Sequence, residues 1–275
     1  MDTALNMIRS YLTAFCVALC PSVAVQAQEY NIQNVARLDI LPGYETQNGH
    51  MIAARIQLAP GWKTYWRAPG GNGIPPSFDW SGSQNLGAVR FHWPEPSVFE
   101  TQGVRTIGYK HELVLPISIT PQQAGKPVSL QGEVQFGVCE DVCLPVKARF
   151  TLNVKGTDAG STAAIKDALN HQPQTAKSAG ISTASCDIAP IKGGFRITAS
   201  IKGKHTLPAG SFTVMEFPHP EVWIEQNSNQ VSGKTLNTSA NLYAYGKTPL
   251  IMDRSRITMT VLGGPRAVEL RGCPS

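Results

Sequence analysis

The stretch VQFGVCEDVCLPVKARF, residues 134–150, places two cysteines, separated by three residues, inside an alternating apolar pattern. This period of two predicts a pair of β-strands. Their inward-facing residues would be Val134, Phe136, Val138, Val146, Ala148 and Phe150. If residues 140–142 form a hairpin loop, Cys139 and Cys143 face each other on its solvent side. Their Cα atoms would then lie about 4.5–5.5 Å apart, which suits a disulfide. The stretch therefore predicts a β-hairpin with an exposed cysteine pair at its tip.

The chain around this hairpin has the composition and spacing of an all-β protein. Its 275 residues include 25 glycines and 20 prolines, and short alternating runs follow one another between residues 30 and 154. In HMIAARIQLAP, residues 50–60, the even-numbered residues from Ile52 onward predict a buried face, and the odd-numbered residues from Ala53 onward predict a face toward water. Strands at this spacing, without intervening helices, predict an immunoglobulin-like β-sandwich.

A change in composition divides the chain into two β-rich parts. Residues 157–180 are poor in β-branched and aromatic residues and contain one helical candidate, Ala163 to Asn170, which Pro173 would end. The alternating pattern resumes at residue 181. We therefore predict two immunoglobulin-like β-sandwich domains, residues 28–156 and 181–275, joined by a linker with a short helix.

The N-terminus has the features of a secretory signal peptide over residues 1–27. It combines an early arginine with an apolar run and a small-residue exit at Ala27. We expect cleavage there and export to the periplasm, where disulfides persist. A lipoprotein attached through Cys20 is an alternative, although Leu19 stands where a small residue is wanted. Cleavage would leave four cysteines, an even number that suggests two pairs.

Charge and motif content exclude several function classes. The net charge of +5 is scattered, with no block of lysine and arginine, so no nucleic-acid partner is expected. The sequence contains no G-x-S-x-G, G-x-G-x-x-G or H-E-x-x-H motif. No bound cofactor is predicted.

Cys186 and Cys273 are predicted to form a structural disulfide. Bridging them closes a loop of 88 residues, for which chain entropy gives about 4.6 kcal/mol of stabilisation, against about 2 kcal/mol for the five-residue loop of Cys139 and Cys143. The long bridge is therefore explained by stability alone, whereas the short one calls for a further explanation.

Three interpretations of the short pair remain open from the residues themselves. It could be a redox centre, since a partner thiolate could reach a sulfur at an exposed hairpin tip. It could be an inert staple. It could also bind Cu(I), which thiolates suit, because CEDVCLP is similar to the Cys-x-x-x-Cys-Pro site of Sco-type copper chaperones. Those proteins have a thioredoxin-like fold, however, and His92 and His111 are weak candidates for a third ligand, so no metal site is predicted.

Four segments together resemble a known family. GWKTYWRAPGGNGIPPSFDW, WPEPSVFE, IGYKHELVLPI and VCEDVCLP occur in the order found in the N-terminal periplasmic domain of the thiol:disulfide interchange protein DsbD, and the similarity is greater to its ScsB-like relatives. The resemblance covers residues 52–154 and is looser beyond them. It implies an immunoglobulin-like fold and a disulfide reductase activity that serves processes such as cytochrome c biogenesis or copper tolerance.

The resemblance also implies roles for individual residues. The redox-active cysteines would be Cys139 and Cys143, with Cys143 forming the mixed disulfide and Cys139 resolving it. An aromatic cap shields the pair in this family, and VFETQGVRTIGY, residues 98–109, matches it, with Phe99 as the cap and Tyr109 as a supporting residue. Phe99 could equally be a core residue.

The resemblance implies partners as well. Because this chain lacks the membrane and thioredoxin-like domains of the full family protein, we expect a separate membrane donor of the DsbD or CcdA type. The expected acceptors are periplasmic thioredoxin-like proteins. Glu140 and Asp141 lie between the cysteines and disfavour a thiolate, so we expect that the pKa of Cys143 is not strongly lowered from that of a free thiol.

Overall fold

The computed structural model describes residues 32–70, 73–101, 103–246 and 250–273, and the predicted signal peptide lies outside them. Strands make up most of this part of the chain. Its helical elements are α1 (Ile32–Val35), α2 (Ala159–Asn170) and the 3-10 turn η1 (Arg254–Arg256). Across the described ranges, no helix is both long and apolar enough to span a membrane.

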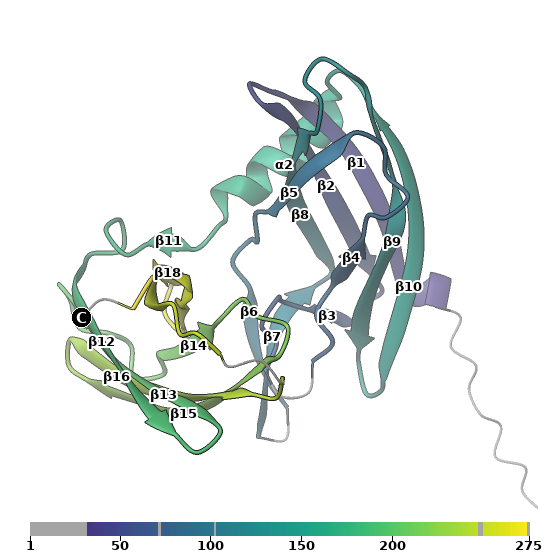
Figure 1. Cartoon of the computed structure of the whole chain (residues 1–275). Helices are drawn as coiled ribbons and strands as arrows, with labels where there is room; N and C mark the ends of the chain where they lie inside the picture. The colour runs from purple at the N-terminus through teal and green to yellow at the C-terminus, as the bar shows by residue number, and fades with distance from the viewer. Residues whose placement is uncertain (1–31, 71–72, 102, 247–249, 274–275) are drawn as a thin grey trace, which may run out of the picture. The chain divides into compact units, whose positions relative to one another are not determined.

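The first β-sandwich consists of a four-stranded and a six-stranded sheet (Figure 1). The four-stranded sheet has the order β1 (Ala36–Thr46), β2 (Gly49–Leu58), β8 (Glu112–Pro121), β5 (Leu86–Phe91). The six-stranded sheet has the order β10 (Cys143–Val154), β9 (Val128–Cys139), β3 (Lys63–Tyr65), β7 (Val104–Lys110), β6 (Ser97–Thr101), with β4 (Ser77–Asp79) also paired to β9. Apolar side chains from both sheets form one buried core, which includes Ile52, Ile56, Leu115 and Ile117 from the first and Leu130, Phe136 and Val146 from the second.

The β9–β10 hairpin forms as predicted. Its antiparallel register runs without a shift from Val128 opposite Val154 to Cys139 opposite Cys143. Val134, Phe136 and Val138 are almost completely buried, because alternate residues of a strand point to one face.

Helix α2 covers a face of β2 that the sequence pattern predicted to be exposed to water. Ala53 was predicted to face water, but it is fully buried, in a cluster with Met51 and Ile165 of the helix. Alternation shows which residues share a face but not whether a helix covers that face. The helix also begins four residues earlier than predicted, because the Asp158 carboxylate accepts a hydrogen bond from the Ser161 amide and caps its first turn.

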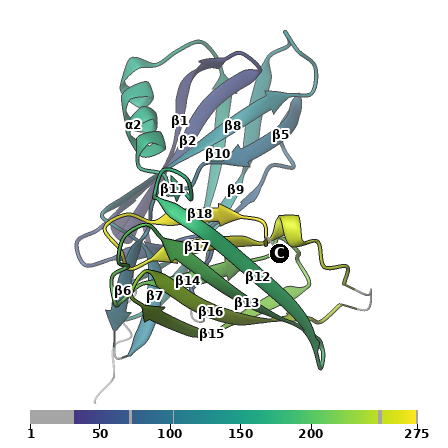
Figure 2. The same ribbon diagram turned by 90° about the vertical axis from the view of Figure 1, so that its left-hand side faces the viewer.

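The second sandwich also consists of two sheets (Figure 2). One sheet has the order β11 (Gln174–Thr175), β18 (Val268–Arg271), β17 (Thr258–Leu262), β14 (Phe212–Glu216). The other has the order β12 (Ile181–Ile191), β13 (Gly194–Gly203), β16 (Thr235–Ala244), β15 (Val222–Ser232). Ile197, Ile201 and Leu242 pack against Met259 and Leu270 between them. The prediction of an all-β protein with two immunoglobulin-like sandwiches and a short helix is confirmed.

The two sandwiches share buried apolar surface. Residues 31–275 form one compact unit, and Phe212, Val214 and Leu262 of the second sandwich belong to the buried cluster of the first. The Arg105 guanidinium lies 4.1 Å from the centre of the Phe212 ring. Because the core is continuous across the junction, the domain boundaries given above remain predictions.

Candidate functional site

The cysteine pair lies at the tip of the β9–β10 hairpin, and its two members differ in exposure. Cys139 and Cys143 form a disulfide with a Cα–Cα distance of 4.2 Å. Cys139 is buried, with 6% of its surface exposed, whereas Cys143 is exposed. The loop between them is closed by a hydrogen bond from the Glu140 amide to the Val142 carbonyl, 3.2 Å. A partner approaching from solvent would therefore meet the Cys143 sulfur first.

The alternating pattern predicted that the face of β9 on which Cys139 lies is open to water. In the structure this face is partly covered. A Cβ atom at Gly137 would lie 2.7 Å from Cβ of Ile74 and 2.8 Å from Cε2 of Tyr65, which is closer than real Cβ atoms approach other atoms. Tyr65 and Ile74 thus cover this end of the strand, and a glycine at position 137 leaves room for them. This cover explains why Gly137 is buried.

Tyr65 makes a direct contact with the disulfide. Its hydroxyl oxygen lies 3.2 Å from Cys143 Sγ. Because a disulfide sulfur carries no proton, the hydroxyl is the donor. Burial raises the pKa of Tyr65 above its ordinary value, so the hydroxyl keeps its proton at neutral pH. Tyr65 lies in the aromatic segment GWKTYWRAPGGNGIPPSFDW, but no local feature of that segment marks it as a neighbour of the cysteines.

Phe99 lies on the same face of the sheet as the disulfide. Lys63 is opposite Cys139, and Tyr65 and Ser97 are each opposite Gly108. Opposed residues share a face and alternate residues of a strand return to it, so Phe99, two residues after Ser97, lies on that face too. Its half-buried ring has Lys110 Nζ at 4.9 Å and Lys63 Nζ at 5.7 Å from its centre. A cap over the disulfide, held by two ammonium groups, is compatible with this placement.

Tyr109 lies on the opposite, core-facing side of β7. It is 7% exposed and belongs to the buried apolar cluster of the first sandwich. Its hydroxyl donates to the Pro94 carbonyl, 2.9 Å, and burial raises its pKa well above the ordinary value. The structure therefore brings Tyr109 beneath the sheet rather than over the cysteines.

Charges of both signs surround the pair. Glu140 and Asp141 are exposed in the loop, and the Glu140 carboxylate lies against the backbone of Gly61. Lys63 is directly opposite Cys139 on the neighbouring strand. Since a nearby ammonium favours a thiolate and nearby carboxylates disfavour it, the lysine opposes the effect that the loop sequence alone suggested.

The second disulfide has a different setting. Cys186 and Cys273 are joined with a Cα–Cα distance of 5.1 Å, and both are buried in the core of the second sandwich. Arg254 donates hydrogen bonds to the carbonyl oxygens of both cysteines. With neither sulfur exposed, this bond is protected from exchange with a partner thiol.

The two histidines considered from the sequence, His92 and His111, do not provide a third metal ligand at the Cys139–Cys143 pair. His92 Nε2 lies 2.6 Å from the Ser118 hydroxyl on the other sheet, and His111 occupies a turn with a positive φ of 65°. Within the described parts of the chain, no three His, Cys, Asp or Glu side chains form a cluster that could hold a metal ion.

The sequence model of the N-terminal domain of thiol:disulfide interchange protein DsbD matches residues 27–155, which include the whole hairpin. Residues 27–155 belong to the DsbD N-terminal domain family. The hairpin with its cysteine pair is thus part of a domain whose family takes part in thiol:disulfide interchange.

The similarity in fold extends beyond the DsbD N-terminal domain. The crystal structure of the N-terminal periplasmic domain of ScsB from Proteus mirabilis resembles this chain with a TM-score of 0.65 and 22% sequence identity. The match covers 90% of this chain and 97% of the ScsB domain, so both sandwiches are included. Comparison with curated protein sequences gave no match.

Proposed function

We propose that this chain is a periplasmic electron-transfer module that reduces the disulfides of partner proteins through Cys139 and Cys143. The observation that carries the proposal is the unequal exposure of the pair: Cys143 is exposed at the hairpin tip, and Cys139 is buried beside it. Thiol exchange needs one accessible sulfur to attack and a second one close by to complete the reaction. Membership of the DsbD N-terminal domain family supports this use of the hairpin.

The reaction begins with the reduced pair. The Cys143 thiolate attacks one sulfur of a partner disulfide, and the other partner sulfur leaves as a thiolate that takes up a proton. Cys139, deprotonated, then attacks Cys143 of the mixed disulfide and releases the second partner sulfur. Two electrons and two protons pass to the partner, which becomes a dithiol, while Cys139 and Cys143 become the disulfide. Little backbone movement is needed because the strand register already opposes the two cysteines.

A separate donor must reduce the pair again. We assign this role to a membrane protein of the DsbD or CcdA type, and we expect thioredoxin-like periplasmic proteins as acceptors. Phe99 would restrict access to the sulfurs until a specific partner displaces its ring. Such a cap would limit the loss of electrons to unrelated disulfides.

Two serine variants test the assignment of roles. Reduced Cys139→Ser should form a lasting mixed disulfide with oxidised glutathione through Cys143, because no second thiol can resolve it. Cys143→Ser should form far less adduct, since its remaining thiol is buried. Mass spectrometry distinguishes the two products. Equal adduct in both variants, or none in either, would contradict the proposed roles. Stoichiometric Cu(I) uptake by the reduced protein, without adduct, would instead favour a copper-binding protein.

A further inference from the structure

The second sandwich contacts a three-residue segment that also forms part of the redox site. This segment is Tyr65, Trp66 and Arg67. The Tyr65 hydroxyl contacts Cys143 Sγ at 3.2 Å. Trp66 is completely buried in the core of the first sandwich. Arg67 reaches out of the first sandwich to side chains of the second.

Arg67 is held by two carboxylates. Its Nε and Nη2 atoms donate to the two oxygens of Glu216 at 2.9 and 3.0 Å, a bidentate pair, and Nη2 also donates to Glu269 at 2.8 Å. Glu216 lies at the end of β14 and Glu269 on β18, so both belong to the second sandwich. Bidentate contacts between a guanidinium and a carboxylate fix the orientation of both groups.

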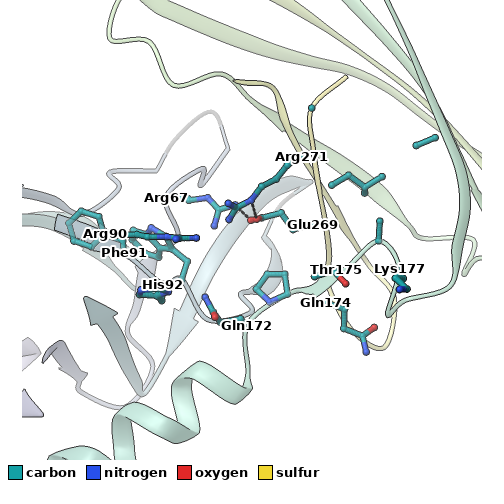
Figure 3. Close-up of a pocket in the computed structure, with 16 residues that line it drawn as sticks. Arg67, Arg90, Phe91, His92, Gln172, Gln174, Thr175, Lys177, Glu269 and Arg271 are labelled. Atoms are coloured by element: carbon teal, nitrogen blue, oxygen red, sulfur yellow. Dashed lines mark hydrogen bonds and ion pairs between the residues drawn. The ribbon is translucent and has the colours of Figure 1, made fainter. Parts of the chain in front are cut away.

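The network is shared and partly shielded from water. Arg271 donates to the second oxygen of Glu269 at 2.9 Å, and Figure 3 shows the side chains of Arg67 and Arg271 meeting at Glu269. The side chains of Arg67, Glu216 and Glu269 are only about 20% exposed, at 21%, 21% and 18%. Arg67 and Glu269 border a cleft of about 600 Å³. Ion pairs at this depth are screened by salt less than pairs at an open surface.

Tyr65 and Arg67 are only two residues apart, and this short distance couples the contact of Tyr65 with Cys143 to the contacts of Arg67 with Glu216 and Glu269. Two residues of backbone span at most about 7 Å, so the Arg67 anchor limits how far Tyr65 can move from Cys143. We propose that the second sandwich is a positioning module for the redox pair, in which Glu216 and Glu269 hold Arg67 and thereby keep the Tyr65 hydroxyl against Cys143. This inference rests on the proposed function of the pair and gives the second sandwich a part in it.

A competing explanation lies within the first sandwich. The Trp66 amide donates to the Ile107 carbonyl at 3.0 Å, and the Ile107 amide donates to the Pro69 carbonyl at 3.1 Å. These backbone bonds alone could hold the segment, in which case the ion pairs would only join the sandwiches. The two explanations differ in what happens at Cys143 when the carboxylates lose their charge.

The test compares two kinds of contact between the sandwiches. Glu216→Gln with Glu269→Gln removes the charges that hold Arg67 and keeps the side-chain shape. The matched control is Glu95→Gln, because Glu95 pairs with Arg266 of the second sandwich at 2.6 Å and accepts a hydrogen bond from the Ala267 amide. The measured quantity is the rate at which iodoacetamide alkylates reduced Cys143, recorded as a function of pH and resolved by mass spectrometry.

We expect the Glu216/Glu269 variant to be alkylated about two- to tenfold more slowly at pH 7, the range for loss of one hydrogen bond. The midpoint of its pH profile should move upward, since the Tyr65 hydroxyl no longer stabilises the thiolate. Tyr65→Phe should have the same effect, and combining the changes should add little because they act on one contact. Glu95→Gln should lower thermal stability and leave the profile unchanged.

An unchanged profile in the Glu216/Glu269 variant, together with a slower rate in Tyr65→Phe, would overturn the proposal and favour the backbone bonds. If the double variant fails to fold, Arg67→Lys keeps the charge but loses the bidentate geometry, and the same comparison applies. Alkylation requires no protein partner, so the result does not depend on whether the pair exchanges electrons. If the wild-type protein does not exchange with oxidised glutathione, that result would count against the proposed function alone.

Discussion

The hydroxyl of Tyr65 lies 3.2 Å from Sγ of Cys143, although 78 positions separate the two residues in the chain. The contact follows from the order of strands, because β3, which carries Tyr65, lies directly beside β9, which carries Cys139. The cysteine pair therefore has a neutral hydrogen-bond donor in addition to the charged residues of its own loop. Several expected properties of the protein depend on this arrangement.

Replacing Tyr65 by phenylalanine should change the reactivity of Cys143 more than the stability of the fold. The ring would still cover Gly137, but the donor to the sulfur would be lost. We expect alkylation of reduced Cys143 at neutral pH to slow about two- to tenfold. Tyr109→Phe is the control, since its hydroxyl bonds to the Pro94 carbonyl in the core. That variant should lose about 1 kcal/mol of stability and keep the wild-type alkylation rate, and a similar slowing in both would argue against a specific role for Tyr65.

Phe99→Ala should open the site. Without the ring, dithiothreitol should reduce the Cys139–Cys143 disulfide several times faster in stopped-flow or quenched trapping experiments. The stability loss should be about 1 kcal/mol, because the ring is half-buried and its contacts with Lys63 and Lys110 are of the exposed cation–π type. Val98→Ala, on the neighbouring residue of the same strand, provides the control. A rate equal to that of the wild type would mean that Phe99 does not shield the pair.

The two disulfides should differ in what they contribute: Cys186–Cys273 mainly to the stability of the fold, and Cys139–Cys143 mainly to thiol exchange. Replacing Cys186 and Cys273 by alanine should reduce the free energy of unfolding by up to about 4.6 kcal/mol, because the bridge closes a much longer loop than the hairpin pair does. Replacing Cys139 and Cys143 should cost about 2 kcal/mol and abolish exchange. Urea denaturation of each double variant measures the two costs. A larger stability loss from the hairpin pair would indicate that it is chiefly a structural bond.

His92 should make stability depend on pH on the acid side of neutrality. Its pKa is lowered by burial and by the nearby charges of Arg90 and Arg271. The unfolded state, with a histidine pKa of about 6.5, therefore binds more protons, and stability falls as the pH drops below that value toward the folded pKa. His92→Gln should make this decline less steep. In NMR, a His92 titration midpoint at or above about 6.5 would contradict the expectation.

Much of the hairpin and its surroundings was predictable from local pattern. The alternating residues of β9 and β10 fix both their inward faces and the register that opposes the cysteines. The edge strand β12 also follows such a pattern, because Ala184, Cys186 and Ile188 lie toward the core of the second sandwich and alternate with the exposed Ser185 and Asp187. By contrast, the covering of Ala53 by α2 was missed, since it depends on a helix more than 100 residues further along the chain.

The cover over the cysteines required the order of strands in the sheet. One signal was present: in GWKTYW, residues 61–66, Trp62, Thr64 and Trp66 alternate with Lys63 and Tyr65. Reading the three as the inward set leaves Tyr65 on the outer face. That face is the cysteine face only because β3 pairs with β9, and the sequence contains no local mark of that pairing. The ion pairs of Arg67 with Glu216 and Glu269 likewise join residues about 150 and 200 positions apart.

The reduction potential of the Cys139–Cys143 pair tests the central claim most directly. The mature protein would be equilibrated with glutathione or dithiothreitol, and thiol trapping with mass spectrometry would report this pair separately from Cys186–Cys273. We predict a potential between about −180 and −270 mV, the range of proteins that exchange electrons through a dithiol. A potential below about −300 mV, which is typical of structural disulfides, would contradict the redox role of the hairpin.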